Sequence, residues 1–313
     1  MKLKIPLWLL FSVLSMLMNG IWGALIELPE KKLTPPFPTT LGYILWSLTF
    51  IPCAIYLLYR TKWKLDHDLK SVINGFIIGI AGAVGSVALF AALRLGPAYI
   101  IFPVISVYPV VTILLSVLLL KERTHIIAAI GIVFAITAIF LLSLQPADKG
   151  GITGFLWLIL SLIAFILFGF QGFYIKVSMK SMLTESIFFY MTISNLLFIP
   201  LAYYATDFSQ PVYRGAGIYL IFAIHLLNSV GALLAMYSLQ YGKVIIVSPI
   251  ASLAPMITTI LSLIIYSRIP YYMNSIGIAL AMIAIYMVTY GELVNEKLKT
   301  GRGQLQDNPG QQV

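Results

Sequence analysis

Charged side chains are scarce in this chain of 313 residues, making up 10% of it against about 25% in soluble globular domains. Because apolar residues make up 60%, a single soluble domain is excluded. The one cysteine, Cys53, lies inside an apolar run, so a disulfide framework and a cysteine-based metal site are excluded too. The apolar runs lack the polar alternation of membrane barrel strands, which leaves helices as the way to cross a bilayer.

Several sequence motifs of enzymes are also missing. No Gly-x4-Gly-Lys-Ser/Thr phosphate-binding loop occurs, so ATP-driven transport within this chain is not expected. No His-Glu-x2-His or Gly-x-Ser-x-Gly pattern occurs, and the three histidines are scattered. No pair of a nucleophile and a base, or of two carboxylates, is visible within an apolar run. We therefore expect no enzyme activity, no cofactor and no metal site.

What the chain does have is long apolar runs, each of about the 20 residues that a helix needs to cross a bilayer. They predict an all-α membrane protein with ten transmembrane helices, at residues 7–26, 39–59, 71–93, 97–120, 125–144, 152–175, 185–204, 216–240, 244–267 and 271–290. A cleaved signal peptide is the alternative for the first run, but its apolar region is too long for one. The polar tail, 292–313, is predicted to be disordered on the cytoplasmic side.

Lysine and arginine are distributed unevenly among the predicted loops. With the N-terminus inside, 14 of the 20 basic residues lie on the inner side. By the positive-inside rule, both termini are predicted to be cytoplasmic, in the plasma (inner) membrane. This bias also accounts for the net charge of +9, so no nucleic-acid partner is needed.

The two halves of the chain resemble each other in sequence. At an offset of 146 residues the third to fifth runs align with the eighth to tenth, and Pro103 and Pro109 fall on Pro249 and Pro255. At an offset of 149 the first run aligns with the sixth. Because each half has five spans, the second half must enter the membrane from the opposite side, which is typical of secondary transporters. Residues 1–146 and 147–291 are therefore predicted to be two inverted-topology five-helix repeats.

Three short motifs resemble those of the drug/metabolite transporter superfamily, in its ten-helix members with two EamA-type domains. They are Trp22-Gly23, the sequence Leu95-Gly96-Pro97-Ala98 before Pro103 and Pro109, and Leu118-Leu119-Leu120-Lys121-Glu122. In the second half, Gln171 replaces the tryptophan, and Arg268 stands where a glutamate would be expected. The resemblance covers the chain to about residue 290 and implies a secondary transporter with a central cavity formed by the first four spans of each half.

The paired prolines are the strongest pointer to a binding site, because corresponding proline interruptions in two repeats often mark one. Each proline removes a backbone hydrogen bond to the carbonyl four residues earlier, which for Pro103 is the carbonyl of Tyr99. Pro103, Pro109, Pro249 and Pro255 are therefore either static kinks or hinges of alternating gates.

Polar side chains inside the predicted spans are the other candidates. His225 and Asn228 lie one helical turn apart near mid-bilayer, as a packing pair or as ligands for substrate or protons. Asn19 and Trp22 share a face of the first span, and Gln171 is the repeat mate of Trp22; helix-to-helix hydrogen bonding is the other interpretation of these amides. Glu27 is the one carboxylate expected within reach of an outward-facing cavity, where it could couple transport to a proton or another cation.

The sequence therefore predicts a secondary transporter for a small polar or amphipathic metabolite, working in membrane lipid as a monomer or homodimer. Efflux of an amino acid or related compound is the commonest theme of the superfamily, and uptake of a sugar or related solute is the main rival. An intramembrane enzyme and a structural or receptor-like membrane protein are the less favoured interpretations.

Overall fold

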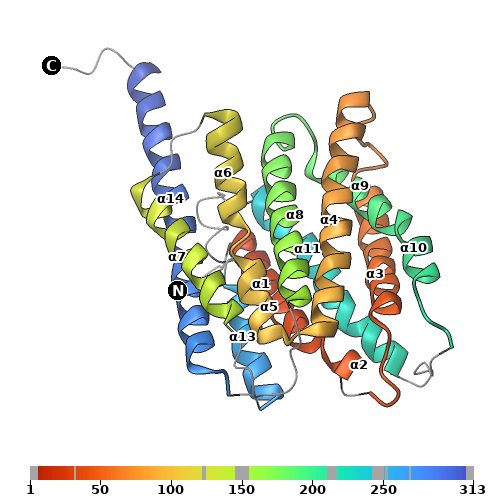
Figure 1. Ribbon diagram of the computed structural model, residues 1–313. Helices are drawn as coiled ribbons and strands as arrows, with labels where there is room; N and C mark the ends of the chain where they lie inside the picture. The colour runs from red at the N-terminus through yellow and green to blue at the C-terminus, as the bar shows by residue number, and fades with distance from the viewer. Residues whose placement is uncertain are drawn as a thin grey trace, which may run out of the picture.

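The computed structural model describes residues 6–31, 33–121, 125–144, 155–209, 217–241, 250, 253–267 and 269–307, and the elements in these ranges are helices (Figure 1). In chain order they are α1 (Leu7–Leu25), α2 (Leu28–Lys31), α3 (Thr39–Arg60), α4 (Leu69–Leu95), α5 (Ala98–Ser106), α6 (Pro109–Leu120), α7 (Ile126–Ser143), α8 (Leu156–Ser178), α9 (Thr184–Leu197), α10 (Ile199–Tyr204), α11 (Gly217–Tyr241), α13 (Ala254–Ile265) and α14 (Tyr272–Asp307).

The apolar runs become membrane-spanning helices, as the sequence predicts. Within the described ranges, eight spans are long and apolar enough to cross a bilayer, with α5 and α6 forming one of them and α9 and α10 another. The shorter apolar helices α7 and α13 supply the remaining two. The protein is therefore an all-α, multi-pass membrane protein, and ten spans fit its two repeats.

The bundle has two ends, which we name by residues. At the Arg60 end α3 ends and α4 begins; at the Glu27 end α1 ends and α5 begins. Asp68 precedes α4 at the Arg60 end, and its carboxylate accepts a hydrogen bond from the Ser71 backbone N–H (3.0 Å). The hydroxyl and the N–H of Ser71 together lower the pKa of the Asp68 carboxyl, because both favour its charged form.

Two of the spans that the structure describes over their whole length are interrupted. The fourth span is interrupted at Val107 and Tyr108, and Pro109 lies in the first turn of α6, where its missing N–H has no helical partner to lose. The seventh span is broken at Phe198, just before Pro200 in the first turn of α10. The sequence did not predict this second break, because the apolar run through it is continuous.

The inverted repeat appears as matching hydrogen bonds. The Thr112 hydroxyl donates to the Gly169 carbonyl (2.8 Å), and the Thr258 hydroxyl donates to the Gly20 carbonyl (2.9 Å). Thr112 and Thr258 are mates at the offset of 146, and Gly20 and Gly169 are mates at 149. The first helix of each half therefore meets a helix of the other half, α1 with α13 and α8 with α6, and α6 and α13 point to opposite ends of the bundle (Figure 1).

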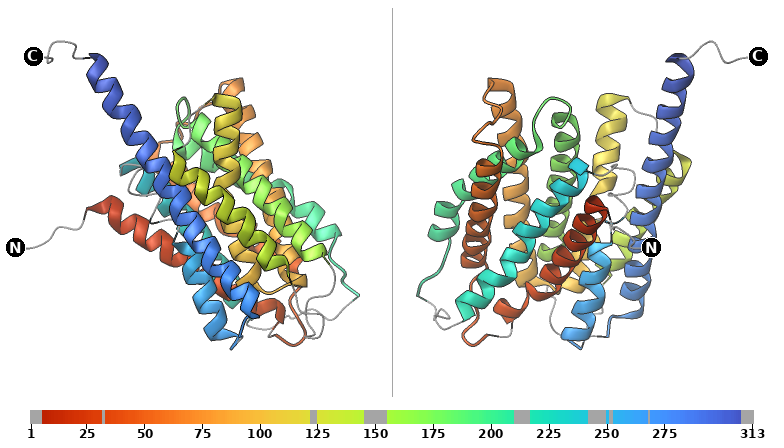
Figure 2. Two further views of the ribbon diagram at one scale, coloured as in Figure 1. Left: turned by 60° about the vertical axis from the view of Figure 1, so that its left-hand side comes forward. Right: turned by 180° about the vertical axis from the view of Figure 1, so that it is seen from behind.

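The fifth and tenth spans, α7 and α14, pack along each other at one side of the bundle (Figures 1 and 2). Their contact repeats the same symmetry. A Cβ added at Gly131 would lie 2.9 Å from Cγ2 of Val288, and one added at Gly277 would lie 3.0 Å from Cγ of Leu142. Because both pairs are mates at 146, each glycine lets the partner helix approach at the equivalent place.

The helix α14 continues past the predicted end of the tenth span to Asp307, so the structure has a helix in the segment for which the sequence predicts disorder. The segment is rich in Glu, Leu and Lys, which favour helices. It also extends an existing helix, which avoids the unfavourable nucleation step. Residues 308–313 lie outside the described part of the chain.

Candidate functional site

A cavity of about 480 Å³ lies among the helices near mid-span. Its wall comes from both repeats. The first repeat contributes residues of α1, α3, α4, α5 and α6, and the second contributes residues of α8, α9, α11, α13 and α14. The amides on the wall are Asn19, Gln171, Asn195 and Asn228. The aromatic rings on it are Trp22, Trp46, Phe50, Phe102, Tyr108 and Phe168.

Three helices are joined by a chain of hydrogen bonds along this wall. The Trp46 indole N–H donates to Oδ1 of Asn228 (2.7 Å), whose Nδ2 donates to Oδ1 of Asn19 (2.8 Å). Nδ2 of Asn19 donates to the Ser15 carbonyl (2.9 Å), and the Ser15 hydroxyl donates to the Gly231 carbonyl (2.7 Å). These bonds fix the orientation of both amides from α3 through α11 to α1. A polar solute would therefore meet side-chain amides whose orientation is already fixed.

Gln171 reaches the cavity from α8. Its Nε2 donates to the Ile78 carbonyl on α4 (3.2 Å). The amide lies over Gly82, where an added Cβ would come within 2.2 Å of Nε2. The absence of a side chain at residue 82 therefore makes the space that Gln171 occupies, and any larger residue there would displace it.

His225 lies behind the wall rather than on it, a position that favours the packing role over the ligand role among the two that the sequence left open. Its side chain is 2% exposed and packs against the Phe90 ring at 5.5 Å. The Trp22 indole N–H donates to its Nδ1 (3.3 Å). Residues three apart on a helix differ by about 60° in direction, enough to point Asn228 into the cavity and His225 toward Phe90 and Trp22. His225 therefore positions Trp22, which does line the cavity.

Glu27 is also away from the wall, against the expectation that it faces a cavity. It is 3% exposed, and its carboxylate accepts a hydrogen bond from the Ala98 N–H at the start of α5. A negative charge there pairs with the unsatisfied N–H groups and positive dipole end of a helix. Its repeat mate Lys176 donates to the Ser116 hydroxyl (3.5 Å) in the last turns of α6. The two mates thus bind opposite ends of the broken fourth span.

The prolines divide between two places. Pro109 and Pro255, which are repeat mates, line the central cavity in the first turns of α6 and α13. Pro103 lies within α5 on an adjoining groove, while the half-buried Tyr99 packs against the core outside the cavity wall. Pro249 lies outside the described residues.

Trp46 and Asn195 are cavity residues that the sequence analysis missed. Each carries a polar group in the middle of an apolar run. Because such groups are scarce in the spans, both residues could have been selected in the same way as Asn228. Phe102 and Phe168 carried no such signal, because apolar residues occupy most positions of every span.

A layer of buried side chains separates the cavity from the Glu27 end. Trp22 and Phe102 meet edge to face at 6.0 Å on the wall. One turn closer to that end, Ile26 at the end of α1, Leu93 on α4 and Ala98 on α5 are each at most 1% exposed. Among the residues that the structure describes, this buried layer lies between the cavity and the Glu27 end.

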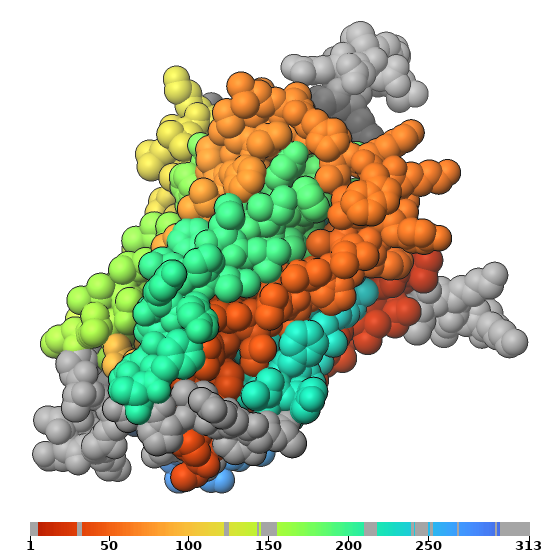
Figure 3. Space-filling view, turned by 90° about the vertical axis from the view of Figure 1, so that its right-hand side faces the viewer, coloured from red at the N-terminus to blue at the C-terminus, as the bar shows by residue number. Residues whose placement is uncertain are grey.

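At the Arg60 end, the loop between α3 and α4 is tied to α9. Oδ2 of Asp66 accepts a hydrogen bond from the Leu183 N–H (2.7 Å), and the backbone N–H of Asp66 donates to the Ser186 hydroxyl (3.0 Å). The Tyr190 hydroxyl donates to the Asp66 carbonyl (2.7 Å). On this face α9 and α10 run beside α3 (Figure 3), so these bonds join the two repeats.

The chemistry available in the cavity is hydrogen bonding and stacking. Among the residues that the structure describes, no Asp, Glu, Lys, Arg or His side chain lines it. The described ranges also hold no group of three or more potential metal ligands. Amides beside aromatic faces suit a small molecule with both polar and apolar surface.

Together these features define a multi-pass helical membrane protein with two inverted repeats around a central cavity. The model of the EamA-like transporter family matches residues 6–144 and 155–290, and the chain belongs to that family. The family consists of transporters of small molecules rather than enzymes, and the resemblance seen in the motifs is confirmed.

Among solved structures, one described as "Crystal structure of protein" superposes with a TM-score of 0.61 at 17% sequence identity. The match covers 92% of this chain and 97% of that one. At this identity the likeness shows the fold alone. No curated protein matches the chain.

Proposed function

We propose that the protein is a secondary transporter that moves a small polar or amphipathic metabolite across the membrane by alternating access. The observation that carries the proposal is the central cavity, which both repeats line with side-chain amides and aromatic rings. Pro109 and Pro255 lie in the first turns of α6 and α13, at equivalent places on its wall. Discontinuous helices at the midplane are a common site of substrate binding in transporters with inverted repeats.

The two ends of the bundle supply the gates in this proposal. The buried layer around Ile26 and Leu93 closes the Glu27 end, and transport requires it to open. Opening that end would be accompanied by closure at the Arg60 end, where Asp66 already binds the start of α9. Following the bias of basic residues, we place the Arg60 end and both termini in the cytoplasm.

Efflux of an amino acid or a related compound is our first choice of activity, and uptake of a sugar or related solute is the second. The family membership supports transport, and the cavity supports a solute with hydrogen-bonding groups and an apolar face. Glu27 and Lys176 bind helix ends, so we assign coupling to neither.

A ligand screen with matched variants tests the proposal. The melting temperature of the purified protein is measured with amino acids, sugars, nucleosides and cationic drugs, since a ligand of the native state stabilises it by mass action. The same screen is run on Asn228→Ala and on the control Thr137→Ala, whose hydroxyl bonds within α7 away from the cavity. We expect a selective ligand whose stabilisation is lost in Asn228→Ala and kept in Thr137→Ala. Equal stabilisation of both variants would place the binding site elsewhere.

A further inference from the structure

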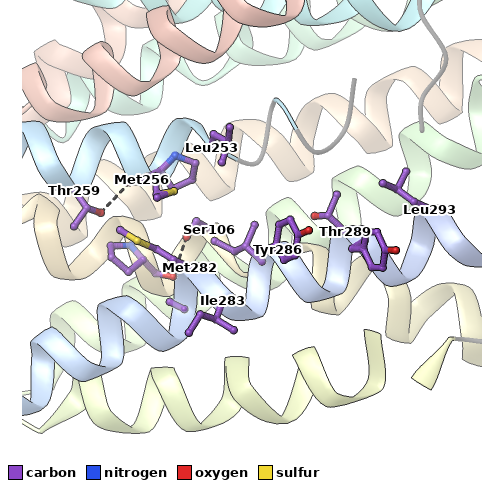
Figure 4. A pocket seen from close by; sticks show the side chains of 14 residues that line it. Ser106, Leu253, Met256, Thr259, Met282, Ile283, Tyr286, Thr289 and Leu293 are labelled. Atoms are coloured by element: carbon purple, nitrogen blue, oxygen red, sulfur yellow. Dashed lines mark hydrogen bonds between the residues drawn. The ribbon is translucent and has the colours of Figure 1, made fainter. Parts of the chain in front are cut away.

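A second, apolar space adjoins the central cavity. This groove has a volume of about 520 Å³ and lies between α13 and α14, with α5 at its floor (Figure 4). Met256 on α13 and Met282 and Tyr286 on α14 line it, with Pro103 and Ser106 on α5. The volume falls in the range of small-molecule sites.

The groove offers almost no free polar group. The Ser106 hydroxyl donates to the Pro103 carbonyl (3.0 Å), and the Thr259 hydroxyl donates to the Pro255 carbonyl (2.9 Å). The Tyr286 and Tyr290 rings stack at 6.0 Å near the end of the groove that is closer to the Arg60 end. No charged side chain lines the groove within the described ranges. Its surface is therefore suited to an alkyl chain.

The groove lies at the depth of the hydrocarbon core. Met282 is ten residues after Tyr272, the start of α14, which places it about 15 Å along the helix, half of the thickness of a bilayer core. Met256 and Tyr286, which line the groove, are both exposed. What adjoins this opening in a membrane is lipid, not water.

The groove and the central cavity share part of their walls. Ser106, Pro255, Ile285 and Thr289 line both spaces. Beyond them the surface changes from methionine and tyrosine to the amides around Asn19 and Gln171. A molecule lying across this boundary would place an apolar chain between α13 and α14 and a polar end in the cavity.

We propose that the groove between α13 and α14 is a lateral binding site for the alkyl chain of an amphipathic substrate, whose uncharged polar end lies in the central cavity. The inference rests on the proposed function, because it takes the central cavity as the substrate site. It names the substrate class as a neutral head group with an alkyl chain, entering from the bilayer. A phospholipid suits the site less well, because its head group would have to leave the interface.

A photoreactive probe tests this site. The probe is decane-1,2-diol carrying a diazirine at the end of its chain, added to the protein in nanodiscs and mapped by mass spectrometry. Pro103 on α5 is buried and lines the groove but not the central cavity, so a chain end that labels Pro103 lies in the groove. We expect labelling of α5, together with labelling of lipid-facing residues on α14.

Two variants fill the groove from opposite sides, Met282→Trp on α14 and Met256→Trp on α13. Each CH₂ group excluded weakens binding about fourfold, so excluding two or more should reduce α5 labelling by more than about tenfold. The control Ile276→Trp, at an exposed position on α14 that does not line the groove, should leave it unchanged. Melting curves show which variants fold, and either filling variant suffices for the test.

Two further arms identify the occupant. Asn228→Ala should reduce α5 labelling by the diol, and a phosphatidylcholine with the same diazirine in its chain should not label α5. Equal labelling by the phospholipid, or diol labelling insensitive to the filling variants or to Asn228→Ala, would overturn the inference. If short polar solutes still bind the central cavity in that case, the proposed function stands without the groove. If neither the diol nor any short solute binds, both fail.

Discussion

Replacing His225 tests whether this residue positions the cavity wall or contacts the substrate. His225→Ala removes a ring that is 2% exposed and leaves the Trp22 N–H without its acceptor. Large-to-alanine changes in a core cost about 2–5 kcal/mol, and an unpaired buried donor adds to that cost. We expect the free energy of unfolding to fall by about 3–5 kcal/mol, while transport per folded molecule falls only a fewfold.

The variant His225→Phe separates the two contributions. It fills the space beside Phe90 but offers the Trp22 indole no acceptor, so the expected loss is about 1 kcal/mol, mainly the hydrogen bond. Unfolding in mixed micelles gives the free energies, and uptake or efflux in proteoliposomes, normalised to folded protein, gives the activity. Transport abolished in His225→Ala with the free energy of unfolding within about 0.5 kcal/mol of the original would refute the reasoning, because a positioning role cannot produce that pattern.

Three other predictions concern the wall, the Arg60 end and the topology. Trp46→Phe keeps the ring but removes the donor to Asn228, so ligand affinity in a binding assay should fall about three- to tenfold with little change in melting temperature; unchanged affinity would remove this bond from the site. Because the pKa of the Asp68 carboxyl is lowered in the folded state, its charge stabilises the fold above the unfolded value of about 3.9, and this contribution is lost as pH falls below it. Between pH 6 and pH 3 the melting temperature should therefore fall more steeply for the original protein than for Asp68→Asn. An equal fall in both proteins would contradict the assignment. Reporter fusions at Leu144 and Glu292 should lie outside and inside respectively, and two fusions on one side would break the five-span repeat.

The repeat could be predicted from the sequence because equivalent residues of the two halves recur at constant offsets. Thr112 and Thr258 fall at one offset and Gly20 and Gly169 at the other, and the structure joins them in two equivalent hydrogen bonds. The length of the apolar runs then set the spans, since a bilayer has one thickness. A fold under such constraints needs few tertiary details to be predicted.

The site was predictable only in part, because polarity locates a residue in the membrane but does not say what it faces. Asn19 and Asn228 were selected as polar residues and do line the cavity, whereas Glu27 and His225 were selected on the same ground and are enclosed by neighbouring helices. Whether such a side chain lines the cavity or packs against a neighbouring helix depends on a rotation of tens of degrees about the helix axis. For His225 the packing of α11 against α1 and α4 decided it, since the ring contacts Trp22 and Phe90.

Accessibility of the central cavity from the two sides of the membrane tests the account most directly. Ala232 lines the cavity, so in a Cys53→Ala background we introduce Ala232→Cys, with Ala135→Cys, 1% exposed between α7 and α14, as the control. A membrane-impermeant thiol reagent is added to vesicles of each orientation. Alternating access predicts that Ala232→Cys reacts from both sides and Ala135→Cys from neither. Reaction of Ala232→Cys from one side alone under all conditions, or from neither side, would contradict the claim that this cavity is the transport path.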